Sequence, residues 1–207
     1  MICKLAQLTA VAALFSATAF ADDAGLYQGV FDPNSSFIRV VAPGESIVAI
    51  DGQTLRDMEA GVSGFVNVMP GDIPVSASLA STSVSAGPGA HYTLIMRDDQ
   101  TMAVLEDAII NDPAKADVTL YNLTDTAAVE LFVPQANATA IEAVDTMSGE
   151  TVGLRAPLTL DFEVRADGET LATVSALDLQ RGVGVSIVLI ETDGTYSATA
   201  TTNSYLK

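Results

Sequence analysis

His91, the single histidine of this 207-residue chain, is the first residue to test for catalysis. A serine enzyme that transfers an acyl group needs a nucleophile, a histidine base and a carboxylate that orients the base. His91 lacks the Asp-x-x-His spacing of SGNH-type esterases, because position 88 is proline, and the chain contains no Gly-x-Ser-x-Gly motif. We therefore expect His91 to be structural, and we predict no catalytic residue and no enzyme.

Carboxylates that could bind Ca²⁺ are the next candidates. Asp98 and Asp99 are adjacent, Asp161 and Glu163 alternate along one segment, and Asp193 precedes a glycine. None has EF-hand spacing, and each position suits a turn or an exposed strand face. We predict no metal site and no cofactor.

Glycoside cleavage also uses paired carboxylates, and spacing in sequence does not exclude such a pair because the two groups converge only in the fold. Clefts that cleave saccharides usually carry aromatic platforms. Aromatic residues make up 6% of this chain and tryptophan is absent, which disfavours this class of enzyme.

The sequence is rich in valine, threonine and alanine, and Asp-Gly and Pro-Gly pairs interrupt it repeatedly. Both features favour short strands separated by turns, and these elements must position the side chains named above. This rhythm predicts an all-β fold of sandwich or small-barrel type. We read residues 53–63 as a loop and residues 113–117 as a short helical turn. We expect strands at residues 36–42, 47–50, 64–69, 73–79, 81–85, 91–97 and 101–105, and then at 117–122, 127–133, 139–145, 150–155, 158–165, 170–179, 183–191 and 196–201.

The two halves of the chain resemble each other at two strands. The segment that begins at Ile38 matches the one that begins at Val118, and the segment that begins at Leu94 matches the one that begins at Val188. Within residues 36–42, alternation places Ile38 and Val40 on one face and Arg39 on the other, with Phe37 and Val41. We predict two tandem antiparallel β-sandwich modules, Ig-like or jelly-roll-like, at residues 22–110 and 116–207.

Residues 1–21 have the pattern of a secretory signal peptide. Lys4 gives the positive start, an apolar stretch follows, and Ala19-Phe20-Ala21 forms a cleavage site. The stretch is shorter than the roughly 18 to 20 clean apolar residues of a membrane span, so we expect cleavage rather than a retained anchor. Cleavage also removes Cys3, and the mature chain then has no cysteine and no disulfide.

The mature chain would keep 8 basic and 26 acidic residues, a formal charge of −18. Such a charge argues against nucleic acid or an anionic membrane surface as a partner. It also argues against tight, charge-driven binding of a polyanionic polymer. Solubility, or a salty habitat, explains the charge equally well.

Several short motifs follow one another along the mature chain in a characteristic order. They are Asp22-Asp23, Leu26-Tyr27, the turn at 33–36, Phe37-Ile38-Arg39-Val40, His91-Tyr92-Thr93-Leu94, Tyr121-Asn122-Leu123-Thr124 and Gln180-Arg181-Gly182. With these motifs, its length and its two-module layout, the chain resembles the periplasmic alginate O-acetylation protein F family. The resemblance covers the whole mature chain.

The resemblance implies a role rather than a reaction. Such proteins are needed to acetylate alginate in the periplasm, where a membrane-bound acyl carrier and separate Ser-His-Asp enzymes handle the acetyl group. It implies a non-catalytic periplasmic adaptor whose partners are the alginate acetyltransferases and the membrane-bound O-acyltransferase. The acidic composition departs from the family and argues against direct binding of alginate.

An alternative is a secreted carbohydrate-binding or adhesion protein built from β-sandwich repeats. It would need an aromatic patch or a Ca²⁺ site, and the sequence offers neither clearly. The apolar arm at residues 22–31 either packs between the modules or docks a partner, and we favour packing because apolar surface is usually buried.

Overall fold

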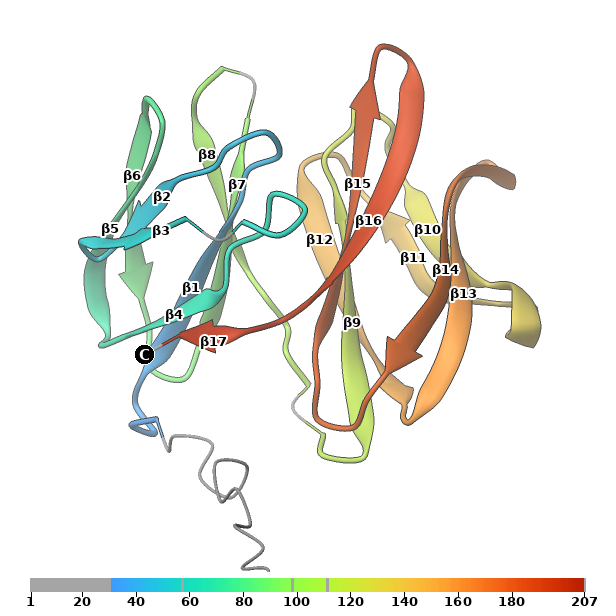
Figure 1. Cartoon of the computed structure of the whole chain (residues 1–207), viewed down its shortest axis with the longest axis horizontal. Coiled ribbons are helices and arrows are strands. Elements are labelled where there is room, and N and C mark those ends of the chain that lie inside the picture. The colour runs from blue at the N-terminus through green and yellow to red at the C-terminus, as the bar shows by residue number, and fades with distance from the viewer. Residues whose placement is uncertain (1–30, 57, 98, 111, 207) are drawn as a thin grey trace, which may run out of the picture. The chain divides into compact units, whose positions relative to one another are not determined.

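The fold class predicted from the sequence, an all-β protein of sandwich type, is confirmed. A computed structural model describes residues 31–206 except 57, 98 and 111, and within them strands predominate (Figure 1). The predicted signal peptide and residues 22–30 of the arm lie outside the described residues. No helix within the described part of the chain is long and apolar enough to cross a membrane.

The first half of the described chain builds two sheets that enclose one apolar core. Sheet A has the strand order β17-β4-β1-β7-β8, and sheet B has the order β3-β2-β5-β6. Ile38 and Leu94 from sheet A meet Ile50 and Val75 from sheet B in this core. The strands are β1 (Ser36–Val41), β2 (Val48–Ile50), β3 (Gln53–Leu55), β4 (Phe65–Val68), β5 (Gly71–Ala77), β6 (Ala80–Ala86), β7 (His91–Met96) and β8 (Met102–Glu106).

The second half repeats this plan with sheet C, β12-β9-β15-β16, and sheet D, β11-β10-β13-β14. Val118 and Ile187 from sheet C meet Leu131 and Phe162 from sheet D. The strands are β9 (Lys115–Asn122), β10 (Val129–Val133), β11 (Ala138–Val144), β12 (Ser148–Arg155), β13 (Leu158–Ala166), β14 (Glu169–Leu179), β15 (Val185–Thr192) and β16 (Thr195–Thr202), with a 3-10 turn, η2, at Pro134–Ala136.

The two halves share one topology, as the repeat predicted. In each half the chain visits the two sheets in the same order, so β1 corresponds to β9 and β7 to β15. Ile38 and Val118 each lie in the core of their own half, as the match requires, but Leu94 lies in the first core and Val188 in the cluster between sheets A and C, so that second match is wrong by one residue. Tyr92 pairs with Ile38 and Val185 pairs with Val118, so the equivalent of Leu94 is Ile187.

Three pairings among the described strands are parallel, which the sequence did not indicate: β1 with β7, β9 with β15, and β17 (Tyr205–Leu206) with β4. The last of these places residues 205–206, predicted to belong to the 116–207 module, in a sheet of the first half. The helical turn predicted at 113–117 is wrong, because Lys115 begins β9 and pairs with Arg155 of β12. The loop predicted at 53–63 contains β3.

Sheets A and C meet through the faces that point away from their own cores. Val41 and Ile95 of sheet A pack with Tyr121 and Val188 of sheet C in a small apolar cluster. The predicted alternation of residues 36–42 is therefore confirmed: Ile38 and Val40 lie in the first core, and Val41 lies in this second cluster.

Candidate functional site

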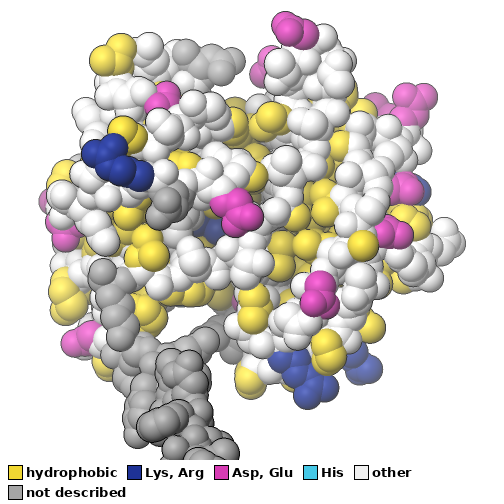
Figure 2. Space-filling model, in the orientation of Figure 1, with side chains coloured by type: hydrophobic (Ala, Val, Ile, Leu, Met, Phe, Trp, Pro, Cys, Tyr) yellow, Lys and Arg dark blue, Asp and Glu magenta, His cyan; other side chains and the backbone are white. Residues whose placement is uncertain are grey.

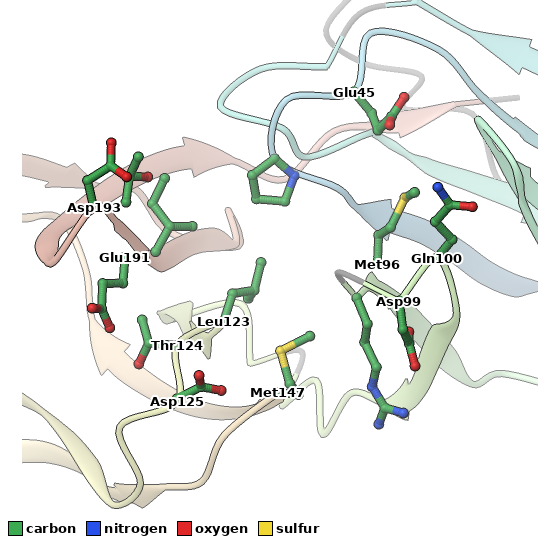
Figure 3. Close-up of a pocket in the computed structure, with 14 residues that line it drawn as sticks. Glu45, Met96, Asp99, Gln100, Leu123, Thr124, Asp125, Met147, Glu191 and Asp193 are labelled. Atoms are coloured by element: carbon green, nitrogen blue, oxygen red, sulfur yellow. The ribbon is translucent and has the colours of Figure 1, made fainter.

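A cavity of about 760 Å³ lies beside the contact between sheets A and C. Its walls come from separate parts of the chain: the β1–β2 turn, the β7–β8 hairpin, the β9–β10 and β11–β12 turns, and the β15–β16 hairpin. Figure 3 shows Glu45 and Asp99 facing Asp125, Glu191 and Asp193 across this groove. We call it the inter-sheet groove.

The floor of the inter-sheet groove is apolar. Leu123, Met147 and Ile190 are half-buried, and they pack against the cluster that joins sheets A and C. Met96 reaches the groove from β7. Unbranched methionine side chains adapt to varied apolar partners, so this floor suits a flexible polypeptide surface.

The rim of the inter-sheet groove is strongly acidic. Hydrogen bonds from the Thr101 hydroxyl and N–H lower the pKa of the Asp99 carboxyl, which keeps it ionised. Arg97 is the one cationic side chain among the lining residues. Asp193 and Gly194 have φ values of 52° and 76°, as in a type I′ hairpin turn, and this turn presents Asp193 at the rim. The carboxylates are those of Glu45, Asp99, Asp125, Glu191 and Asp193.

Asn122 fixes two of the turns that line the groove. Its Oδ1 accepts hydrogen bonds from the N–H and hydroxyl of Thr124, at 3.1 and 2.8 Å, which shapes the β9–β10 turn. Its Nδ2 donates to the carbonyls of Val144 and Asp145 at 3.3 and 3.2 Å, just before Met147. One buried amide thus sets the positions of both Leu123 and Met147.

Next to the groove, a buried arginine ties sheet A to sheet C. Arg39 is 1% exposed. Its Nε donates to Thr93 Oγ1 at 2.9 Å, its Nη1 to Asn203 Oδ1 at 2.7 Å and its Nη2 to the Tyr121 hydroxyl at 2.5 Å. The guanidinium also lies 4.2 Å from the centre of the Phe65 ring. A buried arginine needs such partners, because an unpaired buried charge is very costly.

Asp107 supplies the negative charge of this network. The hydroxyls of Thr93 and Tyr121 donate to its two oxygens at 2.5 and 2.7 Å. Burial raises the pKa of the Asp107 carboxyl, while Arg39 and the two hydroxyls oppose that rise. Burial also raises the pKa of the Tyr121 phenol, so Tyr121 stays protonated and acts as a donor to Asp107. Arg39, Thr93, Asp107 and Tyr121 form what we call the buried network.

His91 lies in an aromatic cluster at the start of β7. Its ring stacks on Phe37 with the ring centres 4.6 Å apart, and Phe65 and Tyr205 meet it edge-on. The Tyr205 hydroxyl lies 3.4 Å from Nε2. Burial, and secondarily Arg39, lower the pKa of His91 to about 4. Phe31, the described end of the predicted arm, joins this cluster by contacting Phe37.

The candidate Ca²⁺ ligands that the structure describes are divided between strand β13 and the inter-sheet groove. Asp161 accepts hydrogen bonds from Gln135 and the Ala176 N–H, and Glu163 is bonded to Arg165 and Thr170. Asp99 and Asp193 line the inter-sheet groove, and Asp98 lies outside the described residues. Within residues 31–206, as far as they are described, no group of three or more His, Cys, Asp or Glu residues could hold a metal ion.

The sequence did not predict the inter-sheet groove because its carboxylates come from four segments far apart in the chain, and each one alone is typical of a turn or an exposed strand end. It did not predict the buried network either. The signal that could have revealed the network was Arg39 itself, a charged residue within a short apolar strand, on the face opposite Ile38 and Val40.

Fold and site together define an all-β protein of two repeated sandwiches. A buried polar network connects the sandwiches, and a groove lined by carboxylates lies beside this contact. The family model described as "Alginate O-acetyl transferase AlgF" matches residues 9–186. The chain therefore belongs to this family, as the resemblance indicated.

A curated relative, the alginate biosynthesis protein AlgF of Pseudomonas fluorescens, is 33% identical over 131 residues. That match spans 60% of this chain and 60% of the relative's length. Among solved structures, the C-terminal domain of AlgF from P. aeruginosa matches 44% of this chain and 99% of that domain, with 16% identity and a TM-score of 0.39. The Bacillus anthracis TIE protein matches 79% of this chain and 34% of its own, with 9% identity and a TM-score of 0.25.

Proposed function

We propose that this chain takes part in alginate O-acetylation as a non-catalytic periplasmic adaptor that contacts the acetyltransferases. The family description and the name of the relative both point to alginate, and the former to its O-acetylation. The adaptor role rests on the inter-sheet groove, whose apolar floor and acidic rim suit a basic segment of another protein.

The negative charge of the groove favours a protein partner over the polysaccharide. Alginate is a polyanion, and the groove places five carboxylates against one arginine. Acidic side chains are also spread over the face drawn in Figure 2, where basic side chains gather at only a few points. A basic polypeptide gains from this field in both affinity and association rate, whereas alginate is repelled.

The surroundings of His91 support the non-catalytic part of the proposal. A histidine that serves as general base must reach its nucleophile and be oriented by a carboxylate. His91 is instead packed among Phe37, Phe65 and Tyr205, and the hydrogen-bond partner at its Nε2 is a phenol. It is the chain's one histidine, so no second residue of this type can take that role.

The test is a binding measurement between the mature chain and the periplasmic acetyltransferase domains encoded beside it. We expect the double variant Asp125→Lys, Glu191→Lys to weaken capture by at least about tenfold at low salt, because both exposed carboxylates line the groove. The matched control is Glu142→Lys, Glu169→Lys, which makes the same charge change at exposed positions outside the groove. Equal loss in both variants would mean that net charge acts, not the groove.

Two further results would overturn the proposal. One is failure of the wild-type chain to capture any of the acetyltransferase domains while circular dichroism shows it folded. The other is saturable binding of bare or acetylated alginate by the isolated chain in calorimetry, which would favour the carbohydrate-binding alternative.

A further inference from the structure

In the first half of the molecule, one outer strand is covered by another segment of the chain. Strand β17 pairs in parallel with β4, with Tyr205 beside Phe65 and Leu206 beside Val66, and Leu206 packs against the first core. Under this cover Val66 and Val68 are only 2% and 3% exposed.

The equivalent strand of the second half has no such cover. Ile38 pairs with Val66 in sheet A, and Val118 pairs with Val152 in sheet C, so β12 is the counterpart of β4. Among the described strands, β12 pairs with β9 alone. Val152 and its neighbour Leu154, the counterparts of Val66 and Val68, are half-exposed although they pack on the second core.

An apolar cavity of about 390 Å³ opens at this flank between β11 and β12. Leu154 and Leu160 line it from β12 and β13, and Ala138 and Ala140 line it from β11. Leu158, also part of the lining, is 46% exposed. We call this cavity the edge slot. Apolar surface left open beside an unpaired strand edge is where an extended segment can add to a sheet.

The edge slot has the opposite charge character to the inter-sheet groove. Arg155 is part of its lining, and Lys115 lies directly opposite Arg155 in the β9–β12 register. None of the slot's lining residues, all of them described, is acidic. Carboxylates lie near this lining: Asp161 accepts a hydrogen bond from Gln135, Glu130 accepts one from Thr139 at 3.3 Å, and Asp112 lies 3.7 Å from Lys115 Nζ. Because Arg155 is the charged residue of the lining itself, the slot favours a segment that places a carboxylate beside Arg155.

We propose that β12 and the edge slot accept an extended segment of a partner protein as an added parallel strand. The pairing of β17 with β4 sets the direction and the face of the added strand, and a two-residue step along β12 places a leucine-sized side chain beside Leu154, which lines the slot. A parallel strand runs toward the end of β12, so a carboxylate that follows the leucine lies beside Arg155. This is a second contact surface, and it does not depend on the adaptor proposal or on the inter-sheet groove.

The test uses the mature chain and a defined peptide, the acetylated sequence Thr-Thr-Asn-Ser-Tyr-Leu of residues 201–206 with a free carboxylate. Amide chemical shifts of the ¹⁵N-labelled protein are followed during titration to millimolar peptide. We expect saturable shifts along Ser148–Arg155, and weaker ones when the peptide leucine is replaced by serine or its carboxylate by an amide.

Protein variants then locate the site. Leu158→Asp and Arg155→Glu are each expected to weaken binding by at least about tenfold, because one puts a carboxylate in the slot and the other removes the cation. Val104→Asp, at a residue that is 43% exposed on β8, is the matched control and should bind normally. Shifts confined to Phe65–Val68 would show displacement of β17, and this result, or no saturable shift along β12, would overturn the proposal.

Discussion

Replacing Tyr121 by phenylalanine would remove one hydroxyl from the buried network and leave the ring in place. That hydroxyl accepts from Arg39 at 2.5 Å, donates to Asp107 at 2.7 Å and lies 3.0 Å from Thr93 Oγ1. A hydrogen bond to a charged group contributes about 1.5–3 kcal/mol, and a neutral one about 1 kcal/mol. Arg39 and Asp107 each keep other partners, so we expect a loss of about 2–4 kcal/mol in the free energy of unfolding rather than the full sum.

The assay is urea unfolding followed by circular dichroism, with the slope of the transition compared between proteins. Tyr196→Phe is the matched control, because the Tyr196 hydroxyl has one neutral partner, Thr126 Oγ1 at 2.7 Å, and lies outside the buried network. We expect that control to lose about 1 kcal/mol or less. The reasoning is refuted if Tyr121→Phe costs no more than Tyr196→Phe.

Three other perturbations test separate features. The pKa of His91 is lowered from 6.5 to about 4 in the folded protein, so between these pH values the unfolded chain binds more protons than the native state. The free energy of unfolding should therefore fall by about 1–3 kcal/mol as the pH drops from 6.5 to 4. His91→Phe should abolish this fall in denaturant titrations at several pH values, and an unchanged slope would contradict the assignment. Gly149→Ala should lower stability by about 1–3 kcal/mol, since its new Cβ would lie 2.6 Å from Cε1 of the buried Tyr121 ring. In thermal melts Gly153→Ala should cost less, because its nearest neighbours are the flexible side chains of Ile110 and Lys115 at 3.0 Å. Removing residues 204–207 should speed hydrogen exchange of the Phe65 N–H, which donates to the Ser204 carbonyl at 2.8 Å, and unchanged exchange at Phe65 would mean that this segment does not protect that edge.

Much of the fold was predictable because strand alternation and turn residues are local signals. The segment 36–42 shows this clearly: Ile38 and Val40 alternate with Arg39, and the two faces meet different surroundings as expected. The strands β3 and β17 have only three and two residues, too few to show the alternation of apolar and polar side chains, so the sequence could not reveal them. Lys115 misled the prediction, since a Pro-Ala-Lys-Ala sequence favours a helical turn locally and the pairing with Arg155 overrides it.

The candidate sites were much less predictable, because their residues converge only in three dimensions. Nothing local in the sequence brings Arg39 to Tyr121, 82 residues away, or Glu45 to the same groove as Asp193. The resemblance motifs did mark relevant positions. Tyr121, Asn122 and Leu123 form one motif, and they serve the buried network, the groove turns and the groove floor in that order.

The pairing of β17 with β4 also has a consequence for the order in which the molecule can assemble. A chain is made from its N-terminus, so strands β1 to β8 exist long before residues 205–206 do. The second sandwich can close as soon as β16 is made, but the first keeps one strand edge open until residues 205–206 have been made. An incomplete chain would keep that edge exposed, and exposed edges promote aggregation. The half of the protein that is synthesised first is therefore the half that finishes folding last.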